Sequence, residues 1–136
     1  MFSKTRTLAI AVACSALAVA ALPAAGHHST AMFEWGTSTP MSNVTVERWV
    51  WTNPHTFLYV RDAEGRRWAF EGMSPNHLAR AGWSRRSLTA GEKIDLTYYK
   101  LRDGRRGGFN VTVTRANGTR LAQLPGAPVA APPARQ

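Results

Sequence analysis

Cysteine is almost absent from the chain: one residue, Cys14, occurs among 136, and it lies inside an apolar stretch near the N-terminus. A lipid anchor at Cys14 would require cleavage just before it. That cleavage leaves residues 8–13 as the apolar core, which is shorter than the about 7–15 residues such a core needs. We therefore reject a lipid anchor and expect a mature protein without cysteine. Such a protein has no disulfide and no cysteine nucleophile, so its stability must come from core packing.

Long apolar runs are equally scarce, since residues 8–22 form the one long uncharged apolar stretch of the sequence. Lys4 and Arg6 precede it and the small residues 24–26 follow it, which is the organisation of a secretory signal peptide cleaved after Gly26. A retained membrane helix is the alternative, but the run is shorter than the about 20 residues needed to span a bilayer. We expect residues 1–26 to be removed and the mature chain to be periplasmic or secreted, without a transmembrane span.

Signatures of catalysis are missing as well. The 8 acidic residues, against 17 Lys and Arg, show no paired arrangement suited to acid–base chemistry. No Gly-x-Ser-x-Gly elbow occurs, and the glycine-rich stretch 104–108 lacks the Lys-Ser/Thr ending of a phosphate-binding loop. Spacing alone does not exclude a Ser-His-acid triad. We nevertheless expect a protein that is not an enzyme.

What the sequence does contain is period-two alternation of apolar and polar residues, the pattern of half-buried strands. Val44, Val46 and Val50, for example, share one parity. The alternation predicts strands at residues 44–51, 56–61, 67–71, 94–99, 110–114 and 119–124. Between the third and fourth of these, a capping Ser74, Pro75 at the first helical position and Gly82 beyond the end predict a helix over residues 75–81.

Three strands, a short helix, two strands and a hairpin return form the element order of a small OB-like β-barrel. An open sheet or a sandwich with a helix at one end is the alternative. The predicted single domain covers residues 27–124, although residues 27–41 show no period and residues 103–108 predict a glycine-rich loop. Residues 125–136 are rich in Pro and Ala and predict a disordered tail.

Four short motifs carry a resemblance to a known family. They are HHS at 27–29, WTNPH at 51–55, EGMSPN at 71–76 and LTAG at 88–91. Together they resemble a widespread family of small exported bacterial proteins that is known as a domain of unknown function, and the resemblance reaches to about Leu124. It implies a protein of the bacterial envelope and supports a barrel, and it implies no activity, substrate or catalytic residue.

Aromatic residues concentrate on the first three predicted strands. Trp49, Trp51, Tyr59 and Trp68 would lie on neighbouring strands there. If exposed together, they would form a stacking platform of the kind that OB-like barrels use to bind oligosaccharides. The alternative is that they fill the core of a small barrel.

Basic residues give the whole chain a formal net charge of +9, of which the predicted signal peptide carries two. Many stand in pairs beside turn residues, at 66–67, 85–86 and 105–106. An aromatic face next to basic loops would favour an acidic glycan or an envelope protein as partner, whereas nucleic acid is excluded by the expected compartment. The alternative is solvated loop charge that keeps the protein soluble.

Histidine supplies the one metal hypothesis, with copper as the expected ligand. If His27 is the first mature residue, its α-amine and ring nitrogen can chelate one ion, and a second imidazole such as that of His55 would complete a T-shaped nitrogen site that suits Cu(II). Cleavage one or two residues earlier would put His28 or His27 third, in a square-planar arrangement that selects Cu(II) or Ni(II). Met32 would add a soft ligand for Cu(I). The alternative is a polar N-terminus with incidental metal affinity, with His55 bonded to backbone in a turn.

Overall fold

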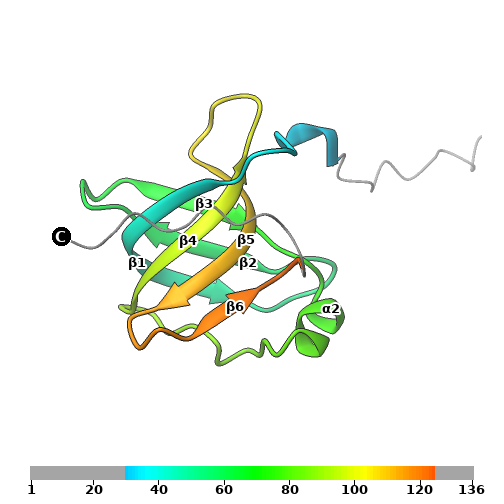
Figure 1. Cartoon of the computed structure of the whole chain (residues 1–136), viewed down its shortest axis with the longest axis vertical. Coiled ribbons are helices and arrows are strands. Elements are labelled where there is room, and N and C mark those ends of the chain that lie inside the picture. The colour runs from blue at the N-terminus through cyan, green and yellow to red at the C-terminus, as the bar shows by residue number, and fades with distance from the viewer. Residues whose placement is uncertain (1–29, 125–136) are drawn as a thin grey trace, which may run out of the picture.

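A computed structural model of the protein describes residues 30–124 (Figure 1). In chain order the elements are the 3-10 helix η1 (Thr30–Met32), β1 (Thr39–Val50), β2 (Phe57–Arg61), β3 (Arg67–Glu71), the α-helix α2 (Pro75–Arg80), β4 (Lys93–Lys100), β5 (Gly107–Arg115) and β6 (Arg120–Ala122). The predicted signal peptide, His27, His28 and the predicted tail lie outside the described residues. Neither helix of residues 30–124 has the length and apolar character needed to cross a bilayer.

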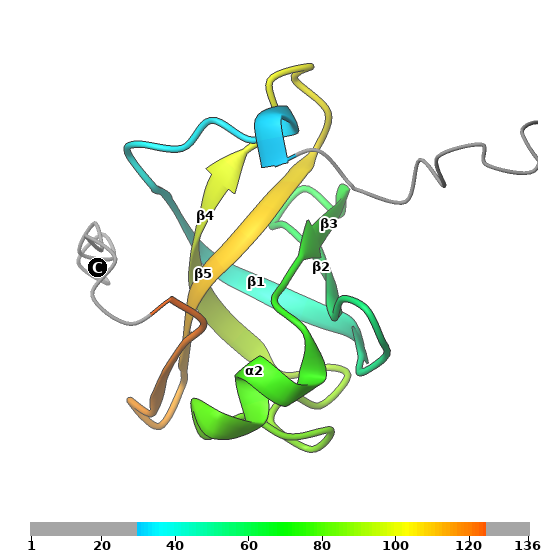
Figure 2. The same ribbon diagram turned by 90° about the vertical axis from the view of Figure 1, so that its right-hand side faces the viewer.

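The six strands form one sheet in the order β3-β2-β1-β4-β5-β6. All of these neighbours pair antiparallel, and an additional parallel pairing of β3 with β5 closes the sheet in a ring. In Figure 2, α2 lies at one end of this ring, and η1 and the turn between β4 and β5 lie at the opposite end. The prediction of a mainly β domain with one short helix between the third and fourth strands is confirmed.

β1 and β5 begin several residues before the positions predicted from the sequence, for identifiable reasons. β1 begins at Thr39, where the alternation is hidden because its pairing with β4 shifts register between Met41 and Val44. β5 begins at Gly107, inside the stretch predicted as a loop. Glycine is needed there because a Cβ at Gly107 would overlap the carbonyl oxygen of Ala69 on the strand that closes the ring.

The core fills the inside of the ring with the apolar half of each alternating strand. Its fully or nearly fully buried members are Val44, Val46, Leu58, Val60, Phe70, Leu78, Trp83, Leu88, Ile94, Leu96, Tyr98 and Val113. Leu78 belongs to α2, so the helix closes one end of the core. Because no described residue is a cysteine, this packing carries the stability that a disulfide would otherwise supply.

The start of α2 is capped as predicted. Ser74 has extended backbone angles and its side chain accepts a hydrogen bond from the His77 amide at 3.3 Å, while Pro75 occupies the first turn. Gly82, beyond the last turn, has φ +86°, a conformation that glycine adopts without strain.

We expect Ser74→Ala to lower the free energy of unfolding by about 0.5–2 kcal/mol, because the His77 amide loses its acceptor. Chemical denaturation of the mature protein measures this. Ser42→Ala is the matched control, since the described residues offer the buried Ser42 hydroxyl no hydrogen-bond partner and its removal should cost little. Equal stability of Ser74→Ala and the parent protein would show that this bond does not hold the helix start.

Candidate functional site

A cavity of about 340 Å³ opens between the N-terminal segment and the segment that leads from β3 to α2. It is lined by Thr30, Phe33, Trp35, His55, Glu71, Gly72, Met73, Ser74, Phe109 and Leu124. The lining is mostly apolar and aromatic, with His55 and Glu71 as its ionisable groups. Concave, largely apolar sites with a few convergent polar groups are where small ligands usually bind.

Aromatic contacts fix the N-terminal wall of this cavity. Phe33 is buried and forms an isolated β-bridge with Leu101, just after β4. The Trp35 ring centroid lies 5.0 Å from that of Tyr99 and 5.3 Å from that of Phe109. The segment before β1, which shows no sequence period, therefore packs on β4 and β5 as an ordered part of the domain.

Trp35 is the large apolar side chain that stays exposed within residues 30–124, with 43% of its surface accessible. Its indole nitrogen donates to the Thr30 carbonyl oxygen at 2.6 Å, which holds the ring over the cavity. Sequence reasoning missed Trp35 because it searched the alternating strands. The available signal was its spacing of two from Phe33 in a segment without strand periodicity.

His55 and Glu71 form a pair at the cavity wall, in which His55 Nδ1 bonds Glu71 Oε1. Their side chains are 34% and 13% exposed. The segment before β2 is tied to the end of β3 next to them: the Gly72 amide donates to the Thr56 carbonyl at 2.8 Å and the Thr56 hydroxyl to the Met73 carbonyl at 3.0 Å. The imidazole of His55 is therefore held by a carboxylate on a fixed backbone.

The predicted metal ligands are only partly within the described residues. His55 lies at the cavity, whereas His27 and His28 precede Thr30 and fall outside. Over residues 30–124, no group of three or more His, Cys, Asp or Glu side chains gathers that could hold a metal ion. Thr30 and His55 nevertheless line the same cavity, so the described chain begins beside the predicted ligand.

The predicted aromatic residues lie on two sides of the sheet. Trp49 packs partly buried against the core, with its ring 5.9 Å from Trp51 and its indole nitrogen donating to the Ser84 carbonyl at 3.0 Å. Trp68 also packs on the core side. Tyr59 is on the outer face, where it pairs in register with Arg48. Their role in binding a ligand stays a prediction.

Trp68 is fixed by ring and hydrogen-bond contacts. It stacks on Phe70 with an interplanar angle of 8°, and its indole nitrogen donates to Asp62 Oδ2 at 2.9 Å. Burial raises the pKa of the Asp62 carboxyl, but the hydrogen bonds from Trp68 and Arg66 outweigh burial and lower the pKa to about 2. Trp68 therefore serves as a structural partner of a charged carboxylate at the β2–β3 turn.

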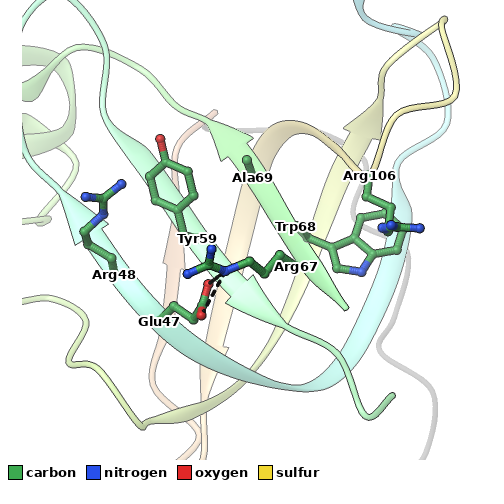
Figure 3. Close-up of a pocket in the computed structure, with 7 residues that line it drawn as sticks. All are labelled: Glu47, Arg48, Tyr59, Arg67, Trp68, Ala69 and Arg106. Atoms are coloured by element: carbon green, nitrogen blue, oxygen red, sulfur yellow. Dashed lines mark hydrogen bonds and ion pairs between the residues drawn. The ribbon is translucent and has the colours of Figure 1, made fainter. Parts of the chain in front are cut away.

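A second concave surface, here named the basic groove, crosses the outer face of β1, β2 and β3 (Figure 3). Its volume is about 570 Å³, and it is lined by Glu47, Arg48, Tyr59, Arg67, Trp68, Ala69 and Arg106. Three arginines from three separate segments, Arg48, Arg67 and Arg106, thus line a groove that contains one carboxylate. Sequence reasoning placed the arginine pairs at 66–67 and 105–106 beside turns, did not single out Arg48, and did not predict that strand pairing brings these residues together.

The sequence of residues 13–110 matches the family of unknown function DUF6152. The chain belongs to this family. Its membership confirms the part of the resemblance that concerned a domain of unknown function. No curated protein and no solved structure matches the chain. The family description assigns no activity, so the function of this DUF6152 protein has to be argued from its own residues.

Proposed function

We propose that this DUF6152 protein is an exported, non-enzymatic binding module of the bacterial envelope that holds one Cu(II) ion near its N-terminus, through His27, His28 and His55. Export follows from the signal-peptide pattern of residues 1–26. The absence of a catalytic signature in the sequence is the reason for proposing a binding role. The copper chemistry rests on histidine type and position.

An OB-like barrel is the scaffold that we propose for this site. The pairing order around the ring, β1 with β2, β2 with β3, β3 with β5, β5 with β4 and β4 with β1, supports that assignment. The helix between β3 and β4 supports it as well. In such a scaffold, an N-terminal segment packed on β4 and β5 is available to carry ligands.

The observation that carries the proposal is that Thr30 lines the same cavity as His55. His28 is two residues from Thr30, and a chain spans at most about 3.6 Å per residue. The N-terminal histidines are therefore tethered within about 7–11 Å of a residue at the cavity wall. This distance is short enough for their nitrogens to share an ion with His55.

The pair of His55 with Glu71 supports the same assignment. Histidine ligands of metals commonly donate the proton of one ring nitrogen to a carboxylate, which fixes the tautomer and makes the other nitrogen a better ligand. Glu71 bonds Nδ1, so Nε2 is the nitrogen that would bind copper. An α-amine with two imidazoles then supplies a nitrogen set of the kind that Cu(II) prefers.

We expect the mature protein that begins at His27 to bind one Cu(II) ion, and His55→Ala to weaken this binding by at least about tenfold. Placing one extra residue ahead of His27 should weaken it similarly, because the α-amine becomes an amide. Affinity should also fall as the pH drops through the imidazole range near ~6.5, since a protonated imidazole cannot ligate. Competition titration against a copper chelator and electron paramagnetic resonance measure affinity and ligand type.

The control is His77→Ala, because His77 lies in α2 with its ring nitrogen 3.1 Å from the Gln123 carbonyl oxygen and outside the cavity lining. It should leave copper affinity unchanged. Any terminus with an amine and histidine binds some copper, so the decisive comparison is with a free peptide of residues 27–33. Equal affinity of the protein and that peptide would show that the fold contributes nothing and would end the copper proposal.

A further inference from the structure

Strand register places two arginines at opposite ends of the basic groove. Arg48 of β1 pairs with Tyr59 of β2, and Tyr59 pairs with Ala69 of β3. Ala69 pairs on its other side with Gly107, the residue after Arg106. Neighbouring strands are about 4.8 Å apart, so the backbones of Arg48 and Arg106 are separated by roughly 14 Å across the sheet. Figure 3 shows Arg48 on one side, Arg106 on the other, and Tyr59 and Ala69 between them.

Both end arginines are held in place without being neutralised. A register shift in β1 between Val46 and Arg48 sets the position of Arg48, whose guanidinium carbon lies 4.6 Å from the centre of the Tyr59 ring. Arg106 is anchored through its carbonyl oxygen, which accepts a hydrogen bond from the Ala69 amide at 3.3 Å. In the part of the chain that the structure describes, no carboxylate lies within ion-pair distance of either guanidinium.

The one carboxylate of the basic groove is already neutralised. Glu47 forms ion pairs with Arg67 at 2.9 Å and with Arg61 at 2.8 Å. The hydrogen bond from Arg67 holds the pKa of the Glu47 carboxyl below its usual range, with the charge of Arg61 contributing. Glu47 therefore does not cancel the charge of Arg48 or Arg106, and the groove keeps two cationic ends.

The floor between these ends is smooth and open. Ala69 is exposed on the outer face of β3, and its methyl group leaves room above the sheet. The face of Tyr59 is covered by the Arg48 guanidinium, and Trp68 is stacked on Phe70. The groove thus offers charged ends and a shallow middle, and the contacts with Arg48 and Phe70 leave less aromatic surface on which a nucleic-acid base could stack.

We propose that the basic groove binds an acidic oligosaccharide, with carboxylates of sugar units paired to Arg48 and Arg106 and an intervening ring over Ala69. Planar guanidinium groups match carboxylates in a bidentate geometry, which favours a uronate-type ligand. Strand addition of an acidic peptide does not fit, because β1, β2 and β3 are each paired on both edges. This site is separate from the copper site, so either one can fail without the other.

The test measures binding of the mature protein to an oligogalacturonate by isothermal titration calorimetry, in the presence of a metal chelator and at low and moderate salt. The double variant Arg48→Gln/Arg106→Gln should weaken binding by at least about tenfold, since it removes two charge-assisted contacts. Arg85→Gln/Arg86→Gln is the matched control: both residues are exposed, they lie outside the basic groove, and the change in net charge is identical. It should retain most of the affinity.

Ala69→Phe provides a variant of unchanged charge, at an exposed strand position that tolerates an aromatic residue. By filling the floor it should also abolish binding, with circular dichroism confirming the fold. Undetectable binding to the parent protein, equal losses in the two arginine double variants, or unchanged binding in Ala69→Phe would each overturn the proposal. A single-stranded oligonucleotide that binds more tightly, and loses affinity in the same groove variants, would overturn the choice of a sugar ligand.

Discussion

Gly108→Ala is expected to destabilise the domain by roughly 3 kcal/mol or more, at the upper end of what overpacking costs. A Cβ at this position would overlap the carbonyl oxygen of Tyr99 and come within 2.8 Å of Tyr98 Cδ2. Gly108 pairs with Lys100 across β4 and β5, so the two backbones would have to separate where the ring closes. At about 4–8 °C per kcal/mol for a domain of this size, a loss of about 3 kcal/mol should lower the thermal midpoint by roughly 12–24 °C.

Gly104→Ala is the control for this prediction. Gly104 lies in the turn before β5, where a Cβ meets open space but φ is +74°, so alanine there costs only the strain of a left-handed conformation, about 1–2 kcal/mol. A loss in Gly108→Ala no larger than that in Gly104→Ala would show that β4 and β5 are not packed as closely as the structure has them.

Gly107 and Gly108 also explain where sequence reasoning was incomplete. Glycines beside Asp103 and the 105–106 arginine pair are typical of a loop, and that stretch was predicted as one. Two of these glycines instead begin β5, because β3 and β4 approach it too closely for a side chain. Close backbone approach depends on partners far away in sequence, which no local pattern reveals.

The elements that could be predicted are those whose signals are local. β3 covers Arg67–Glu71, as the alternation predicts. α2 starts at Pro75, because Ser74 is a capping residue and proline suits the first turn of a helix, and both are visible in the sequence. β1 was recognised only in its second half, since the register shift near Met41 interrupts the period that marks a strand. Alternation of apolar and polar residues therefore predicts a strand only as far as the first bulge, where the pattern is interrupted although the strand continues.

The candidate sites were harder to predict because they depend on register. The His55–Glu71 pair forms because Phe57 is opposite Glu71 in the hairpin of β2 and β3, which puts His55 near the end of β3. The basic groove needs a bulge in β1 and the parallel closure of β3 with β5 to bring Arg48 and Arg106 to one face. Residue type identified His55 as a candidate, whereas only the pairing of strands shows that Glu71 lies beside it and that Arg48 and Arg106 share a groove.

Phe70→Ala is expected to lower the free energy of unfolding by about 3–5 kcal/mol, a large part of the roughly 5–15 kcal/mol that holds a typical domain together. Phe70 is fully buried, stacks on Trp68 and lies 4.9 Å from Tyr98 between ring centres, so its removal leaves a void at the middle of the core. Urea denaturation measures the loss, and Phe57→Ala is the control. Phe57 is half-buried on the adjacent strand and stacks on Tyr59 at 6.5 Å, so truncating it should cost less than half as much. Equal losses of unfolding free energy in the two variants would place the main packing of the domain outside the ring. Because Phe70→Ala also removes the ring on which Trp68 stacks, this variant should in addition loosen the wall of the basic groove.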